Sequence, residues 1–228
     1  MPPRKSGNVQ RDAAAPRREP LTRQRALTSA VALADAEGLR AVTMRRLAQD
    51  LGVEAMSLYH HVSGKDDILD GMVDAVFAEV EIPDDTDWRT AMEHRAHSMR
   101  SALARHPWAL GLMESRTQPG PATLAHHEAL LRSLREAGFS LPATAHAAAL
   151  LDAYIYGFAM QEAQLPFETG EQTQELAADV MAGFPEGAYP YFTEFAMGHV
   201  MQPGYDFGDE FDFGLGLILD GLHLQLQR

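Results

Sequence analysis

The stretch "VTMRRLAQDLGVEAMSLYHHV", residues 42–62, specifies how the first part of this chain folds. Thr43 is a good N-cap for a helix over residues 44–51, in which apolar side chains recur at the spacing of one helical face. Gly52 follows this helix directly and accepts the backbone conformation of a tight turn. A second short helix is predicted over residues 53–61. Helix, glycine turn and helix together form the helix-turn-helix pattern.

The second helix of this motif is expected to bury one face and to expose the other. Its inward residues, three or four positions apart, are Ala55, Leu58 and Val62. The outward residues are then Met56, Ser57, Tyr59, His60 and His61. Apart from Glu54 in its first turn this helix carries no acid, so it can lie in the major groove of DNA without repelling phosphates.

The rest of the sequence is helical in pattern as well. A helix that ends at Gly38 precedes the motif, and Ser63 with Asp66 predicts a capping-box-like start for a helix over about 64–80. Beyond a break at Pro83, helical spacing resumes over about 87–104, 108–114, 121–137, 143–164, 171–182, 189–200 and 210–227. We find no alternation of period two, so the sequence predicts an all-α fold.

The composition limits the classes of protein to consider. The 228 residues include no cysteine, which excludes disulfides, cysteine-ligated metal sites and a thiol nucleophile. No run of 18 apolar residues occurs, and the N-terminus lacks the apolar segment of a signal peptide. We therefore expect a cytoplasmic protein without a membrane-spanning helix.

The charge of the chain is unevenly distributed. Residues 1–65 carry 11 Lys and Arg against 6 Asp and Glu, a net charge of +5. The remaining residues carry 8 against 26, a net charge of −18. Phosphate backbones attract the first part and repel the second, which predicts one DNA-binding part and one part with another task.

Two segments carry a resemblance to a known family. The segment "VTMRRLAQDLGVEAMSLYHHVSGKDDILDGM", residues 42–72, resembles the DNA-binding domain of TetR-family transcriptional repressors. The segments "EAGFS", residues 136–140, and "FDFGLGLILDGL", residues 211–222, resemble the tetracycline-repressor type of C-terminal domain. The resemblance implies a homodimeric repressor that binds a palindromic operator in double-stranded DNA and that a small-molecule inducer releases.

The resemblance also implies a division of the chain and roles for the residues of the motif. We expect a flexible basic arm over 1–20, a three-helix DNA-binding domain over 21–66 and a ligand-binding and dimerisation domain over 67–228. Thr43, Tyr59, His61 and Lys65 would contact phosphates, and Arg45 would contact a phosphate or a base edge. Base edges would meet Ala55, Met56 and Ser57. The role of His60 stays open between DNA contact and plain exposure to solvent.

The basic N-terminal segment allows two interpretations. In the first, an arginine from this segment enters the minor groove of DNA. In the second, the segment is a solvated tail that adds only general attraction to phosphates. The arginines concerned are Arg17, Arg18, Arg23 and Arg25.

The second domain is expected to form both the dimer and the effector pocket. The helices over about 143–164 and 210–227 are apolar on more than one face, so each can touch its own core and a partner subunit. The family places a ligand cavity among the fifth to eighth helices, where the candidate residues are His94, Arg95, Met99, Trp108, Leu112, Met113, Arg116, His127, Tyr154, Phe158 and Gln161.

These side chains predict a bulky, largely apolar effector with a few polar groups. The positions of the tetracycline repressor's own drug-binding and metal-chelating residues hold different side chains here, so a magnesium–tetracycline chelate is not expected.

The rival interpretation is a helical metal-dependent hydrolase. His94 and His97 have the i, i+3 spacing of helical metal ligands, and His126, His127 and Glu128 are adjacent. No HExxH or GxSxG motif and no glycine-rich phosphate loop accompanies them. We therefore expect no enzyme activity, no catalytic residue, no bound metal and no cofactor.

Overall fold

A computed structural model of the chain describes residues 20–84, 87–166, 170–185 and 187–227. Every regular element within these ranges is helical, which confirms the all-α prediction. The N-terminal elements are α1 (Arg23–Glu37), a 3₁₀ turn (Leu39–Ala41), α2 (Met44–Leu51), α3 (Ala55–Leu58) and α4 (Lys65–Phe77). The later elements are α5 (Trp88–Arg105), a 3₁₀ turn (Pro107–Ala109), α6 (Leu110–Met113), α7 (Pro121–Glu136), α8 (Leu141–Glu162), α9 (Gly170–Ala182), α10 (Pro190–Phe195), a π-helical segment (Ala196–Val200), a 3₁₀ turn (Phe207–Asp209) and α11 (Glu210–Leu226).

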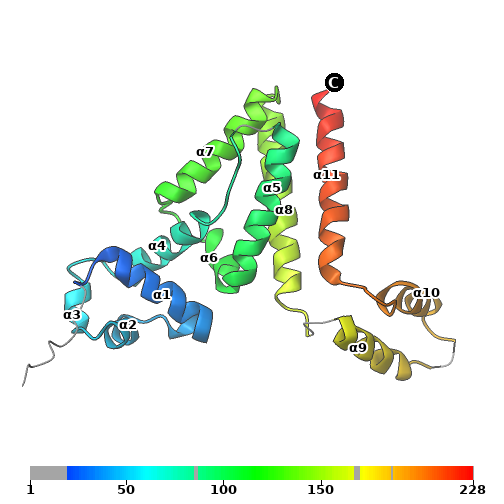
Figure 1. Cartoon of the computed structure of the whole chain (residues 1–228), viewed down its shortest axis with the longest axis horizontal. Coiled ribbons are helices and arrows are strands. Elements are labelled where there is room, and N and C mark those ends of the chain that lie inside the picture. Colours follow the sequence, from blue (N-terminus) through cyan, green and yellow to red (C-terminus); the bar gives the residue numbers. More distant parts are fainter. Residues whose placement is uncertain (1–19, 85–86, 167–169, 186, 228) are drawn as a thin grey trace, which may run out of the picture.

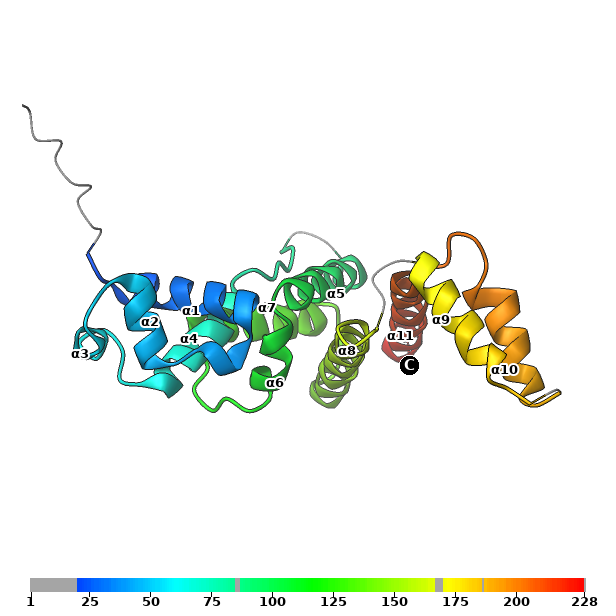
Figure 2. The same ribbon diagram turned by 90° about the horizontal axis from the view of Figure 1, so that it is seen from below.

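The helices form an elongated molecule with distinct ends. Helices α1 to α3 pack together at one end, which we call the reading head (Figure 1). Helices α5, α7, α8 and α11 form the body, and α8 and α11 run side by side within it. Helices α9 and α10 pack on each other at the opposite end (Figure 2). Helix α4 lies between the head and the body and contacts both α1 and α7.

The reading head folds as its sequence pattern predicts. The Thr43 hydroxyl accepts a hydrogen bond from the backbone N–H of Arg46 at 3.2 Å and so caps α2. Gly52 takes the left-handed conformation, with φ at 66°, which lets the chain turn sharply into α3. The residues that the pattern places inside are buried against α1, namely Leu47, Ala48, Leu51, Leu58 and Val62.

The prediction of a helix over 53–61 is wrong in its length. Helix α3 spans only Ala55–Leu58, and no side chain caps it at Glu54. After Leu58 the backbone forms hydrogen bonds between residues three apart, as in a 3₁₀ turn. They run from His60 N to Ser57 O at 3.3 Å and from His61 N to Leu58 O at 2.9 Å. A helix this short is stabilised by packing against its neighbours and not by its own hydrogen bonds. Its last residues can therefore form a tighter turn in place of an α-helical one.

The predicted capping box at the start of α4 is also wrong in its partners. The N-cap of α4 is Gly64, which makes no side-chain cap bond. The carboxylate that returns to the Ser63 N–H, at 2.9 Å, belongs to Asp67, four residues on. Asp66 instead pairs with Arg116 at 3.1 Å.

Smaller differences affect two other predicted helices. The helix predicted over 108–114 is divided into the 3₁₀ turn at Pro107–Ala109 and α6. The helix predicted over 189–200 changes after Phe195 into the π-helical segment. Both changes lie beside prolines or glycines, which weaken regular helical bonding.

Helix α4 is attached to the body by a capping carboxylate. Asp74 of α4 accepts hydrogen bonds from the backbone N–H of Thr123, at 2.8 Å, and from the Thr123 hydroxyl, at 3.0 Å. Thr123 lies in the first turn of α7, where backbone N–H groups lack helical partners. A Cβ on Gly120 would lie 2.2 Å from the Asp74 carboxyl carbon, so glycine leaves room for this contact.

Helices α8 and α11 are apolar on two sides, as predicted. The stripe of α11 that faces the body is buried and consists of Phe211, Leu215, Leu219 and Leu222. Its other side is exposed, with Phe213 at 70% and Leu217 at 59% of their surface. Leu150 and Met160 of α8 are similarly exposed. An exposed apolar surface on two adjacent helices is typical of a contact with a second subunit.

We expect the change Asp74→Ala to lower the free energy of unfolding by about 1–2 kcal/mol, because it leaves the first turn of α7 without its carboxylate cap. Asp74→Asn keeps an acceptor oxygen and should cost less than half as much. Chemical denaturation of both variants measures the difference. Equal losses would show that Asp74 contributes through its charge and not as a cap.

Candidate DNA-binding surface and effector cavity

The head exposes most of the residues predicted to contact DNA. Thr43, Arg45, His60, His61 and Lys65 are exposed, and all come from the tips of α2, α3 and α4. Met56 exposes 72% and Tyr59 49% of their surface, although both are large. Ala55 and Ser57 are half-buried beside them. The shortened α3 therefore leaves the predicted set on one end of the head, with the two histidines in the turn after the helix.

The arginines of the N-terminal segment are placed only in part. Arg17 and Arg18 lie outside the described residues. Arg23, half exposed, forms an ion pair with Asp67 of α4 at 2.7 Å. Hydrogen bonds from Arg23 and from Ser63 hold the pKa of Asp67 below its ordinary value. Arg25 is half-buried, and its backbone N–H completes the cap at Thr22.

Three of the predicted pocket residues line one cavity, which lies between α4, α6, α7 and α8. Its volume is about 230 Å³. Met113, Arg116 and His127, which the sequence analysis gives as candidate effector contacts, are among its walls. The residues that sequence analysis missed are Asp70, Val73, Phe77, Glu114, Gln118, Pro119, Thr123, Asp152 and Tyr156. The i, i+4 spacing of Asp66, Asp70 and Asp74 on α4 is the sequence signal that could have identified this side of the helix.

One wall of the cavity is tied to α4 by Arg116. Its Nε donates to Asp70 Oδ1 at 2.5 Å, and its Nη2 donates to Asp66 Oδ1 at 3.1 Å. The bond to Asp70 is the main reason why the pKa of Arg116 is raised above its ordinary value. A group that enters the cavity therefore meets an arginine already engaged with α4.

A buried polar network lies behind the opposite wall. Arg95 of α5, 1% exposed, pairs with Asp152 of α8, and its Nε donates to His126 Nε2 at 3.1 Å. Burial, together with the charge of Arg95, lowers the pKa of His126 to about 3, so this ring is neutral. Burial also raises the pKa of the Tyr156 hydroxyl. Arg95 Nη1 and His126 Nδ1 have no hydrogen-bond partner.

The other predicted pocket residues lie away from this cavity. Tyr154 of α8 stacks on Phe211 of α11, and its hydroxyl donates to the Phe211 carbonyl at 2.9 Å. Phe158 of α8 meets the Phe211 ring edge to face. Leu112 and Met99 are buried in the core, and His94 and Gln161 are exposed. Trp108 faces the head, where its Nε1 donates to Asp35 Oδ1 at 2.6 Å.

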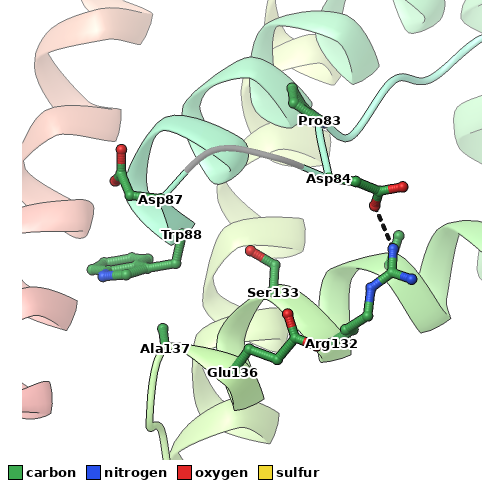
Figure 3. Close-up of a pocket in the computed structure, with 9 residues that line it drawn as sticks. Pro83, Asp84, Asp87, Trp88, Arg132, Ser133, Glu136 and Ala137 are labelled. Carbon is green, nitrogen blue, oxygen red and sulfur yellow. Dashed lines mark hydrogen bonds and ion pairs between the residues drawn. The ribbon is translucent and has the colours of Figure 1, made fainter.

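A second hollow, of about 300 Å³, lies at the far side of the body from the head. Trp88 at the start of α5 lies across it from Ser133 and Glu136 of α7 and from Ala137, which follows that helix (Figure 3). Asp84 and Arg132 form an ion pair at its edge. No residue of α4 lines this hollow. A ligand there would have no direct contact with the helix that leads to the head.

The histidines that suggested a hydrolase lie apart and have separate partners. His94 lies 4.0 Å from Glu81, and His97 lies 3.3 Å from Asp212 of α11. His127 Nδ1 bonds to the Thr123 carbonyl at 2.8 Å. Within the described parts of the chain, no group of three or more His, Asp or Glu side chains is placed to hold a metal ion. No helix in the same ranges is long and apolar enough to span a membrane.

An exposed helix-turn-helix joined through one helix to a body with an internal cavity defines a DNA-binding regulator with an effector domain. Comparison with known proteins agrees with this class. Residues 26–72 match the family of bacterial regulatory proteins of the tetR type, and residues 82–226 match the tetracyclin repressor-like C-terminal domain. The chain belongs to the TetR family of transcriptional regulators.

Several relatives are similar over nearly the whole chain. The HTH-type transcriptional repressor DrrR1 of Streptomyces coeruleorubidus is 37% identical over 90% of this chain and 78% of its own. The tetracycline repressor protein class A from transposon 1721 of Escherichia coli is 29% identical over 86% of this chain and 88% of its own. ActR of Streptomyces coelicolor, solved in complex with actinorhodin, has a TM-score of 0.75 at 28% identity and covers 89% of this chain and 95% of its own.

The buried network predicts that substitution of Arg95 and substitution of Asp152 lower the free energy of unfolding by different amounts. Asp152→Asn should lower the free energy of unfolding by about 3 kcal/mol, because it leaves the Arg95 charge buried without its partner. Arg95→Met should cost clearly less, since Asp152 is one-quarter exposed and can be hydrated. Urea denaturation at neutral pH compares them. A larger loss for Arg95→Met would contradict this assignment.

Proposed function

We propose that this chain is a cytoplasmic transcriptional repressor without enzyme activity. It binds a palindromic operator as a homodimer and leaves the DNA when a small, bulky and largely apolar effector enters the cavity. Residues 1–20 form the basic arm, residues 21–66 bind DNA, and residues 67–228 bind the effector and the partner subunit. The observation that carries the proposal is the position of α4, which touches the head on one side and lines the cavity with Asp70, Val73 and Phe77 on the other.

The DNA contact follows from the exposed end of the head. Arg45 and Lys65 supply positive charge for phosphates, and the Thr43 hydroxyl and the N-terminus of α2 add donors there. Met56 and Ser57 lie where base edges would pass, and an exposed thioether suits a thymine methyl group. The arginines of the arm add attraction from the flank.

The partner subunit covers the exposed apolar side of α8 and α11. Leu150, Met160, Phe213 and Leu217 would be removed from water there, which stabilises the dimer at about 25 cal/mol per Å² of apolar surface. A two-fold dimer places the heads about 34–36 Å apart, over successive turns of the major groove. This symmetry is the reason for the palindromic operator.

The cavity explains how an effector would change the spacing of the heads. A volume of about 230 Å³ lies below the usual range for drug-sized ligands, so a bulky effector requires its walls to move. One wall is α4, and another is Arg116, which binds Asp66 and Asp70 of α4. An effector that fits only the displaced α4 lowers operator affinity by its difference in affinity for the two states.

The DNA-binding assignment predicts a loss for Arg45→Ala. Selection of bound sequences from a random DNA pool should first yield a palindrome. On that operator we expect the variant to bind about tenfold more weakly, with a salt dependence reduced by about one phosphate contact. Arg132→Ala, which removes an exposed cation from α7, serves as the matched control and should bind as the wild type does. The DNA-binding assignment is wrong if Arg45→Ala binds the operator as tightly as Arg132→Ala does, or if the selection yields no palindromic sequence.

Release by an effector is tested separately on the same operator. The related ActR binds actinorhodin, so this molecule is the first candidate to add. An effector should weaken operator binding at least tenfold, and Val73→Trp, which fills the cavity, should abolish that effect. The variant should still bind the operator without effector. A molecule that binds the cavity and tightens operator binding would contradict the assignment as an inducible repressor.

A further inference from the structure

A buried histidine lies where the head meets the body. His106 follows α5 directly, and its side chain is 8% exposed. Its Nδ1 lies 2.7 Å from Asp35 Oδ1 of α1, and its Nε2 lies 3.0 Å from Glu79 Oε1, two residues after α4. One ring therefore joins the head to the ends of both α4 and α5.

The geometry requires a particular protonation state of this ring. A carboxylate oxygen can only accept a hydrogen bond, and a neutral imidazole has a single N–H to donate. Both contacts of His106 are hydrogen bonds only when both ring nitrogens carry a proton. Loss of one proton removes one of the two bonds and turns a lone pair of the ring toward a carboxylate.

The surroundings of His106 suit a positive charge. Asp35 faces it from α1, and Glu79 faces it from the end of α4. Arg105 donates to Glu79 Oε2 from its Nη2 at 2.6 Å and from its Nε at 3.1 Å. The turn after α5 contributes no charge but donates the Trp108 Nε1–H to Asp35. Partial burial acts to raise the pKa of Glu79, but bonds from Arg105 and His106 outweigh it and lower that pKa.

We propose that protonated His106 is a positioning residue that fixes α1 of the reading head to the ends of α4 and α5. The form of the protein in which His106 bonds to both carboxylates, the closed form, holds one proton more than the open form, in which one of these bonds is broken. By linkage, the closed contact is favoured at low pH and weakens when a rise in pH removes one proton from the ring. A head held in one orientation loses less freedom on binding DNA, so the closed form should bind an operator more tightly.

The contact can be tested without DNA because the fluorescence of a neighbouring tryptophan, Trp108, depends on the charge of the His106 ring. Trp88 and Trp108 are the two tryptophans, and Trp108 lies 5.8 Å from the His106 ring, measured between centroids. In a Trp88→Phe background only Trp108 emits, and a charged imidazole beside an indole quenches its emission. We expect the emission of Trp108 to rise when a rise in pH removes one proton from the His106 ring.

Three further variants in this background make the result specific. His106→Gln should remove the pH-dependent change, whereas His97→Gln, at an exposed ion pair far from the head, should leave it intact. Asp35→Asn keeps its volume and an acceptor for Trp108, and it should also reduce the change, even if His106→Gln fails to fold. A titration that persists in both His106→Gln and Asp35→Asn would overturn the proposal.

The consequence for DNA rests on the proposed function and has its own measurement. At pH 6 we expect His106→Gln to bind the selected operator about fivefold more weakly than the wild type, the effect of about one hydrogen bond. The difference between the two should shrink at pH 8 if the ring has lost a proton there, because it then keeps only one of its two bonds. Equal affinity at both pH values, or tighter binding by the variant, would overturn the positioning role. If the wild type binds no operator, the proposed function fails while the Trp108 titration still tests the contact.

Discussion

The carboxylates of α4 are the constraint on which the arrangement of this protein depends. Asp67 pairs with Arg23 of α1, Asp66 and Asp70 pair with Arg116 beside the cavity, and Asp74 caps α7. Each partner comes from a different element. Helix α4 is therefore attached by directional bonds to both the head and the body, and a displacement of α4 must exchange some of these bonds for others. Because the bonding partners are discrete, α4 can occupy two distinct positions and not a continuous range of positions.

The charge asymmetry of the chain acquires a structural meaning from this arrangement. The excess of basic residues lies within residues 1–65, and Asp66, Asp67 and Asp70 of α4 pair with arginines. The acidic remainder is carried by the body, away from the DNA that the head would meet. The protein can therefore attract phosphates at one end without drawing its effector domain onto the DNA.

The sequence predicted the helices of the reading head closely, whereas only three of its candidate effector residues line the cavity between α4, α6, α7 and α8. Thr43, Gly52 and the buried Leu47, Leu58 and Val62 follow from spacing within a few residues, and the structure places each as expected. The errors at α3 and at the start of α4 concern ends of helices, where a neighbouring side chain such as Asp67 can replace the expected cap. Met113, Arg116 and His127 were identified as pocket residues, but Asp70, Asp152 and Tyr156 were not, because their role depends on which helices lie opposite them.

The sequence alone determined the helical class, the helix-turn-helix and the two-sided apolar character of α8 and α11, because these arise from periodicity and capping along short stretches of chain. Only the tertiary structure decided that Trp108 turns toward the head, that Arg95 lies behind the cavity wall and that His106 joins α1 to α4. The partners in the last network are 71 residues apart for His106 and Asp35 and 27 for His106 and Glu79. Contacts between such distant residues depend on how whole helices pack, and no local pattern in the chain encodes them.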